Sequence, residues 1–250
     1  MIDLAQYDAV LFDLDGVLTA TASIHAACWK RTFDEFLDAR ASESSGTFAP
    51  FSIDRDYPPY IDGKPRYDGV DSFLRSRGIE LPWGDTADPP SRKTVCGLGN
   101  RKNQLFNEIL ATEKPEIFHG SVKLAHSLRE MGIKTAVVSA SKNAGPVLAA
   151  AGITELFDVI VDGTVAARLG LAGKPAPDPF LEAARALDVA PERAVVVEDA
   201  IAGVQAGRAG NFGLVIGIDR EGQGDALYEH GADIVVTDLE ELQGDGEQQE

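Results

Sequence analysis

Short apolar runs alternate with amphipathic stretches through the second half of the chain. An apolar run bounded by polar or glycine residues predicts a buried strand, whereas spaced apolar positions over a longer stretch predict a helix. Strands are predicted at residues 134–138, 158–161, 194–197, 213–218 and 234–236. Helices are predicted at residues 122–131, 145–151, 178–187, 200–209 and 225–230. This alternation predicts an α/β fold, in which a parallel sheet carries helices on both of its faces.

The first half of the chain follows a different pattern. Residues 9–12 form one apolar run, which predicts a further strand. After it, spaced apolar positions predict helices at residues 24–37, 70–77 and 102–110, and a turn-rich piece at 41–60 interrupts them. We interpret residues 22 to about 118 as a helical insertion that follows the first strand. The polar and acidic residues 244–250 are expected to form a disordered tail.

Two acids, Asp13 and Asp15, follow the first predicted strand directly. Alternate residues of an extended chain point the same way, so both carboxylates are expected to face one pocket at the carboxyl end of the strand. Like charges at this spacing are costly unless a cation lies between them, and hard oxygen ligands suit Mg²⁺. The alternative is an ordinary loop start. An EF-hand is excluded because Gly16 follows Asp15 without the required third Asp or Asn.

The strand predicted at residues 134–138 ends next to Ser139 and the start of a helix. A hydroxyl group together with the backbone N–H groups of a helix start can hold a phosphate. The alternative is that Ser141 or Asn143 simply caps the helix. The position of Ser139 at a strand end nevertheless makes it a candidate partner for the two acids.

Lys174 and the pair Glu198–Asp199 complete this set of candidates. Pro175 restricts the backbone after Lys174 and can aim the amine inward, although a surface lysine is the common interpretation of such a motif. Glu198 and Asp199 follow an apolar strand, where paired acids are unusual without a cation. A D-x-D pair, a serine, a lysine and a Glu–Asp pair at successive positions after strands therefore predict one shared site.

Composition limits the partners of the chain. At 250 residues and 44% hydrophobic content, it is one large domain or a domain with an inserted module. Lys and Arg number 23 against 40 Asp and Glu, which gives a net charge of −17. This charge argues against nucleic acid or an anionic membrane as the main partner. An anionic substrate would therefore need a local basic pocket.

Several other function classes are not supported by the sequence. A secretory signal peptide is not expected, and no apolar run of the sequence is long enough to span a bilayer. Cys28 and Cys96 form no metal motif and are expected to be unpaired thiols in a reducing cytoplasm. Residues 97–102 only faintly resemble a glycine-rich phosphate loop. They follow no clear strand, and Lys102 stands where the third glycine should be, so a dinucleotide-binding interpretation fails.

These motifs, in this order, resemble those of the haloacid dehalogenase superfamily of phosphotransferases, and within it the β-phosphoglucomutase subfamily. The resemblance covers nearly the whole chain and rests on residues 13–19, 62–68, 101–103, 139–143, 173–179 and 195–199. It implies a Rossmann-like α/β core at residues 1–20 and 119–250, with an inserted α-helical cap domain at residues 21–118. Ala20, where the family usually has an acid, and the long segments 41–60 and 80–91 depart from the family pattern.

The resemblance also implies the catalytic roles of the core residues. Asp13 would be the nucleophile and a metal ligand, and Asp15 the general acid and base as well as a metal ligand through its backbone carbonyl. Ser139 and Lys174 would bind the transferring phosphoryl group. The implied metal ion is Mg²⁺, and its ligands would be Asp13, Asp15, Glu198 and Asp199.

A second set of residues is implied to bind the substrate. It contains Thr21, His25, Trp29, Gly63, Arg66, Lys102, Ser141, Lys142 and Asn143. Arg66 would hold the non-reacting phosphate together with Lys142 and Asn143, and His25 and Lys102 would link closure of the cap to the position of Asp15. Without the resemblance, His25 would be interpreted as a packed helix residue, and Trp29 as part of the cap core.

The function implied by the resemblance is that of a β-phosphoglucomutase. Such an enzyme interconverts β-D-glucose 1-phosphate and glucose 6-phosphate through an aspartyl-phosphate, with β-glucose 1,6-bisphosphate as activator and intermediate. The alternative is a Mg²⁺-dependent sugar-phosphate phosphatase on the same scaffold. A non-catalytic sensor would be expected to lose the nucleophile or the metal acids, and all are present. A small phosphorylated sugar as partner, a monomer and a cytoplasmic location are expected.

Overall fold

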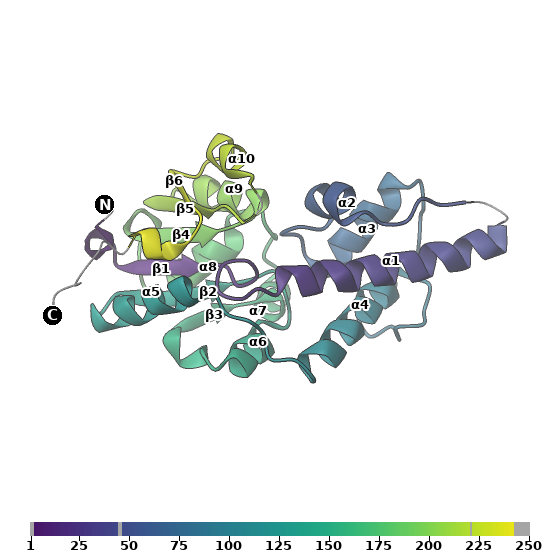
Figure 1. Cartoon of the computed structure of the whole chain (residues 1–250), viewed down its shortest axis with the longest axis horizontal. Helices are drawn as coiled ribbons and strands as arrows, with labels where there is room; N and C mark the ends of the chain where they lie inside the picture. The colour runs from purple at the N-terminus through teal and green to yellow at the C-terminus, as the bar shows by residue number, and fades with distance from the viewer. Residues whose placement is uncertain (1–2, 45–46, 221, 243–250) are drawn as a thin grey trace. The chain divides into compact units, whose positions relative to one another are not determined.

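The computed structural model describes residues 3–44, 47–220 and 222–242, and the chain divides into two compact units (Figure 1). Unit 1 contains Met1–Ala20 and Pro115–Glu250, and unit 2 contains Thr21–Lys114. Residues 115–118, which the sequence analysis assigned to the cap, thus fall in unit 1. The role of unit 2 as a cap stays a prediction. The tail predicted at residues 244–250 lies outside the described residues.

Unit 1 is built on a parallel sheet with the strand order β3-β2-β1-β4-β5-β6. Its strands are β1 (Ala9–Phe12), β2 (Lys134–Val138), β3 (Val159–Val161), β4 (Ala194–Glu198), β5 (Leu214–Ile218) and β6 (Ile234–Val236). Phe12 in β1 is level with Val137 in β2 and Val197 in β4. The chain segments that follow these three strands therefore leave the sheet at the same edge.

Helices connect the strands of unit 1 and cover the sheet. They are α5 (His119–Glu130), α6 (Ala144–Ala151), α7 (Gly163–Leu169), α8 (Asp178–Ala186), α9 (Ile201–Ala209) and α10 (Gly224–Glu229). The short 3-10 helices are η1 (Leu4–Gln6), η2 (Thr154–Leu156), η3 (Pro191–Arg193) and η4 (Leu239–Leu242). Leu11 packs in one cluster with Phe180 of α8 and Val204 of α9. Phe12 points to the opposite face and is equally buried, so both faces are covered, as predicted.

Helix α7 was not predicted from the sequence. Its seven residues are too few for a clear period, and none of them is fully buried, although Val165 packs partly buried against the core. Its ends carry the only local signals. The Asp162 side chain accepts hydrogen bonds from the backbone N–H groups of Thr164 and Val165, and Gly170 ends the helix in the left-handed conformation.

Unit 2 is helical and has a core of its own. Its helices are α1 (Ala22–Ser44), α2 (Ile53–Tyr60), α3 (Arg66–Ser76) and α4 (Val95–Leu110). Phe33 on α1 is fully buried at the centre of an aromatic cluster, with its ring centroid 5.2 Å from that of Trp29, 5.1 Å from that of Phe51 and 4.2 Å from that of Phe73. Within the described residues, no helix is both long enough and apolar enough to cross a membrane.

The prediction of a turn-rich piece at residues 41–60 is wrong at both ends of that range. Helix α1 continues to Ser44, and α2 contains Pro58 and Pro59 in its last turn. Tertiary contacts outweigh the proline signal here. The Asp56 carboxylate accepts a hydrogen bond from the backbone N–H of Ser52 at 2.8 Å and pairs with Arg77 at 2.6 Å, and both contacts fix the helix.

Replacing Phe33 by alanine should destabilise unit 2 by about 3–5 kcal/mol, because the aromatic cluster would lose its central ring and leave a cavity. Urea unfolding followed by circular dichroism would measure this change. The matched control is Ile53→Ala, which truncates an exposed side chain on α2 and should cost far less. Equal losses for the two variants would contradict the central position of Phe33.

Candidate active site

The residues that follow β1, β2 and β4 form one site at the carboxyl edge of the sheet. Asp13 continues β1, and its backbone N–H donates to the Val197 carbonyl at 2.9 Å. Ser139 continues β2 in the same way by donating to the Val161 carbonyl at 3.0 Å. Glu198 is the last residue of β4. Strand register thus brings together side chains that are far apart in the sequence.

Lys174 lies at the centre of this site. Its ammonium group donates to Asp13 Oδ1 at 2.5 Å and to the Val138 carbonyl at 3.1 Å, and it also pairs with Glu198. Only 4% of Lys174 is exposed, so the alternative of a surface lysine is wrong. Burial alone would lower the pKa of Lys174, but the carboxylates of Asp13 and Glu198 outweigh it and raise this pKa. Lys174 is therefore a buried cation.

Glu198 is also buried, and it contacts Lys174, two backbone N–H groups and the backbone of Gly203. Burial raises the pKa of its carboxyl group, while Lys174 opposes this shift. Glu198 Oε2 accepts hydrogen bonds at 3.1 Å from the backbone N–H groups of Asp199 and Ala200. A Cβ atom at Gly203 on α9 would lie 1.9 Å from the carboxylate carbon of Glu198, so only glycine leaves room for it. The sequence analysis missed Gly203, although it follows the acid pair by about one helical turn.

Three carboxylates at this edge can hold a metal ion. Asp13, Glu198 and Asp199 each offer an oxygen atom, and these atoms all lie within 4.8 Å of one another. An all-carboxylate donor set of this kind fits a hard cation such as Mg²⁺. The carboxylate of Asp15 is not a member of this group of three. Its predicted ligand is the backbone carbonyl, and this assignment stays a prediction.

Asp15 lies in a tight turn that packs against Asp199. Gly16 has a φ of +91°, which glycine adopts readily, and its N–H donates to the Thr19 carbonyl at 2.8 Å. A Cβ atom at Gly16 would lie 1.7 Å from Asp199 Oδ2. The Thr19 hydroxyl closes the turn by donating to the Leu14 carbonyl at 3.2 Å. The position of Asp15 is thus determined by a turn that requires glycine.

The segment from Ser139 to Asn143 is ordered by its own side chains. Ser139 Oγ accepts a hydrogen bond from the backbone N–H of Ser141, and Ser141 Oγ accepts one from that of Asn143, both at 3.1 Å. The Asn143 side chain makes no capping hydrogen bond to α6, so that part of the capping alternative is wrong. Lys142 packs beside Gly163 at the start of α7, where an added Cβ atom would lie 3.0 Å from its Cγ.

Unit 2 groups three of the predicted substrate residues in one basic cluster. His25 Nδ1 lies 2.5 Å from the ammonium group of Lys102, and Arg66 donates to Asn103 Oδ1 at 2.7 Å. Burial, together with the charges of Lys102 and Arg66, holds the pKa of His25 well below its usual value. The imidazole is therefore neutral, and Nδ1 accepts the hydrogen bond from Lys102, since an ammonium group can only donate. Asn103, which orients Arg66, was recognised only as part of a basic segment.

The other predicted substrate residues of unit 2 have structural surroundings. Trp29 is buried in the aromatic core and stacks on Phe33, which agrees with the alternative of a core residue. Thr21 is fully buried, and its carbonyl accepts a hydrogen bond from the backbone N–H of His25 at 2.9 Å. Gly63 has a φ of +67° in the turn before α3. Their substrate-binding roles stay predictions.

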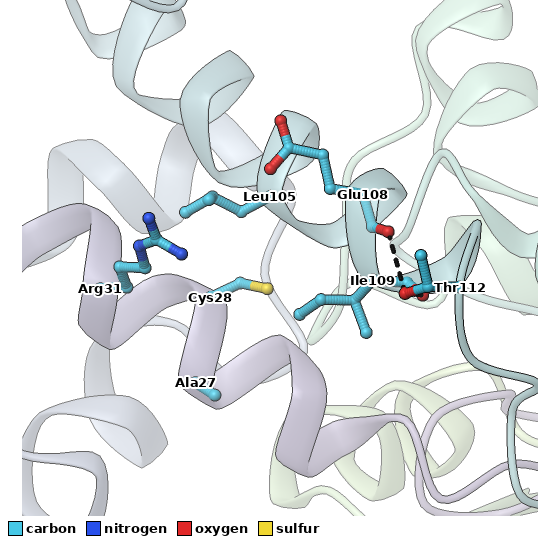
Figure 2. Close-up of a pocket in the computed structure, with 7 residues that line it drawn as sticks. All are labelled: Ala27, Cys28, Arg31, Leu105, Glu108, Ile109 and Thr112. Carbon is cyan, nitrogen blue, oxygen red and sulfur yellow. Dashed lines mark hydrogen bonds between the residues drawn. The ribbon is translucent and has the colours of Figure 1, made fainter.

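A separate cavity of about 260 Å³ lies between α1 and α4 (Figure 2). Its lining residues are Ala27, Cys28, Arg31, Leu105, Glu108, Ile109 and Thr112, and none of them belongs to the predicted site. Cys28 and Cys96 are buried thiols, and burial raises the pKa of Cys28. A raised pKa lowers the fraction of a thiol that is present as the reactive thiolate.

Removing one carboxylate should weaken metal binding. Asp199→Asn is expected to lower the affinity for Mg²⁺ on the order of 10- to 100-fold, as changes around metal sites commonly do. Isothermal titration calorimetry of the metal-free protein would measure this effect. The control is Asp225→Asn, which neutralises an exposed acid of unit 1 that is outside the carboxylate group. Unchanged affinity in Asp199→Asn would contradict the assignment of Asp199 as a ligand.

Comparison with known proteins agrees with this geometry. A model of the family described as haloacid dehalogenase-like hydrolase matches residues 7–211. The chain is 50% identical over 237 residues to a β-phosphoglucomutase of Mycobacterium tuberculosis, with 94% of this chain and 90% of that protein covered. A β-phosphoglucomutase of Bacillus subtilis is 34% identical over 236 residues, with 94% and 91% covered.

A solved structure gives the same result for the fold. The crystal structure of a β-phosphoglucomutase from Clostridium difficile matches with a TM-score of 0.73 and 26% identity, and the match covers 94% of this chain and 93% of that chain. The sheet order, the converging carboxylates and the extent of these matches lead to one conclusion. The chain belongs to the haloacid dehalogenase superfamily, within its β-phosphoglucomutase-like subfamily.

Proposed function

We propose that this protein is a β-phosphoglucomutase that interconverts β-D-glucose 1-phosphate and glucose 6-phosphate. The observation that carries the proposal is the buried contact of Lys174 with Asp13 and Glu198, beside the third carboxylate of Asp199. This arrangement suits phosphoryl transfer, in which positioned charge supplies most of the catalysis. The names of the relatives support the mutase reaction within that class.

In the first half-reaction, an Asp13 carboxylate oxygen would attack the phosphorus atom of the substrate. The bond between phosphorus and the sugar oxygen would break as the aspartyl-phosphate forms, and Asp15 would give its proton to the leaving oxygen. In the second half-reaction, Asp15 would take a proton from the accepting sugar hydroxyl. That oxygen would then attack the aspartyl-phosphate and release Asp13.

Three other groups would support this transfer. Ser139 and Lys174 would bind the oxygens of the phosphoryl group, where negative charge accumulates. When bound to Asp13, Glu198 and Asp199, Mg²⁺ would supply positive charge that offsets the repulsion between the nucleophile and the phosphate. The backbone carbonyl of Asp15 would be a further ligand.

A mutase must also hold the phosphate that does not react, since the β-glucose 1,6-bisphosphate intermediate carries two. Arg66 suits this role because its guanidinium group binds phosphate with two parallel hydrogen bonds. Its hydrogen bond to Asn103 leaves further N–H donors and fixes the side chain. The phosphate-binding roles predicted for Lys142 and Asn143 stay part of this proposal. In a chain with a net charge of −17, such local groups are needed to bind an anion.

The second candidate function is hydrolysis of a sugar phosphate. The matching family model describes hydrolases, and the Asp13 site would serve water as acceptor by the same steps. The two functions differ in the acceptor of the phosphoryl group alone. They therefore share Asp13, Asp15 and the metal ligands, and a product assay separates them.

Purified protein supplied with β-glucose 1-phosphate, Mg²⁺ and β-glucose 1,6-bisphosphate should form glucose 6-phosphate without releasing free phosphate. A coupled dehydrogenase assay and a phosphate assay would follow the two products. Asp13→Asn should abolish turnover because an amide cannot act as the nucleophile. Free phosphate released at a rate comparable to that of glucose 6-phosphate would favour the phosphatase instead.

Arg66→Ala should lower the mutase rate far more than hydrolysis of a small aryl phosphate, which has no second phosphate. A loss on the order of 100-fold is expected for the mutase, as for the loss of a strong charge-assisted contact. Arg75→Ala is the matched control, because Arg75 lies on the same helix and is exposed in a pair with Asp71. Equal losses for both substrates would deny Arg66 its role at the second phosphate.

A further inference from the structure

Arg220 links three segments at the carboxyl edge of the unit 1 sheet. It follows β5, the neighbour of the strand that ends in Glu198. Its Nε donates to the Gly16 carbonyl at 2.9 Å, and its Nη1 donates to the Thr237 carbonyl at 2.8 Å. The Asp219 carboxylate accepts hydrogen bonds from the backbone N–H groups of Gln223 and Gly224 at the start of α10, so the residue before Arg220 is tied to that helix.

The guanidinium group also lies over the ring of Phe118, 3.7 Å from its centroid. Phe118 belongs to the segment that enters α5, and its backbone N–H donates to the Leu18 carbonyl at 3.0 Å. The next pair along, Thr19 and Ile117, forms an antiparallel bridge. The two segments that flank unit 2 in the sequence are therefore paired with each other, and Arg220 packs on that pair.

The carbonyl that Arg220 holds belongs to the turn of Asp15. Gly16 follows Asp15 directly and contacts the Asp199 carboxylate so closely that a Cβ atom has no space. The turn is thus fixed by Asp199 on one side and by Arg220 through its carbonyl. A change at Arg220 would remove one of the contacts that hold the backbone next to Asp15. The hydrogen bond from Asp13 to the β4 backbone and the contact of Asp13 with Lys174 involve other groups and would stay in place.

We propose that Arg220 is a positioning residue for proton transfer by Asp15. It holds the Asp15–Gly16 turn against Phe118, so that the carboxyl group of Asp15 stays in reach of the leaving oxygen. The proposal rests on the proposed function, because it takes Asp15 as the general acid. It adds to that function a residue outside the motifs that the phosphoryl-transfer chemistry uses.

The dependence of the rate on the leaving group distinguishes this role from a purely structural one. Phenol is a poor leaving group and needs a proton as it departs, whereas 2,4-dinitrophenolate departs as a stable anion and needs none. The rate of the first turnover should be measured for both aryl phosphates by rapid mixing, before breakdown of the aspartyl-phosphate limits the signal. Urea unfolding of each variant would be measured in parallel.

Arg220→Gln should slow the release of phenol on the order of 10- to 100-fold, which is a part of what a general acid contributes. Its release of dinitrophenolate should change less than about threefold, because that step does not depend on the acid. Phe118→Leu should show the same selectivity to a smaller extent, since it removes only the stacking contact. Asp15→Asn gives the reference pattern for complete loss of the acid.

The matched control is Arg208→Gln. Arg208 also holds a backbone carbonyl, that of Gly231, and pairs with Asp233, so the variant loses a carbonyl contact and a charge partner away from the Asp15 turn. It should leave both rates unchanged. Equal slowing of both esters in Arg220→Gln, or no slowing of either, would overturn the positioning role. Failure of the proposed function has a different signature, namely a wild-type protein with no first-turnover release, or a release that survives in Asp13→Asn.

Discussion

The concentration of carboxylates at one sheet edge is the constraint on which the rest of unit 1 depends. Asp13 and Glu198 are buried, and Asp199 lies beside them. Their mutual repulsion is offset by Lys174, which contacts the first two from within the protein. Removing one partner from such a buried set typically costs about 3–5 kcal/mol, because a charge is left uncompensated. The groups proposed to transfer phosphate thus also determine whether this edge of the sheet is stable.

These carboxylates can pack closely only because two positions beside them are glycine. Gly16 makes room for Asp199, and Gly203 makes room for Glu198. Each glycine lets a carboxylate lie directly against the backbone of another segment, which limits the motion of the acid. Polar groups that are fixed before the reaction need no reorganisation during it, and this is the main source of electrostatic catalysis. The turn at Gly16 brings Asp15 into the same arrangement.

Unit 2 gathers cations, whereas the edge of the unit 1 sheet gathers carboxylates. It gathers Arg66 and Lys102 in a chain that is strongly acidic overall. His25, which lies beside them, adds no third positive charge, because burial keeps it neutral. Its imidazole can therefore accept a hydrogen bond from Lys102. The aromatic core around Phe33 supports the helix that carries His25. The basic cluster therefore lies on three helices, α1, α3 and α4, that all contribute to this core.

The sequence by itself determined the strands and the set of residues at their carboxyl ends. The apolar runs at residues 9–12, 134–138 and 234–236 predicted strands with the observed bounds. The pattern is clearest in β1, which is buried along its whole length and therefore needs continuous apolar residues. Parallel strands then place their following residues at one edge, which made Asp13, Ser139 and Glu198 predictable. Only the tertiary structure decided the pairing of Lys174 with two acids, the space at Gly203 and the link from Arg220 to the Asp15 turn. These contacts join distant parts of the chain and follow no periodic pattern, so their energies arise only once the sheet and its loops are assembled.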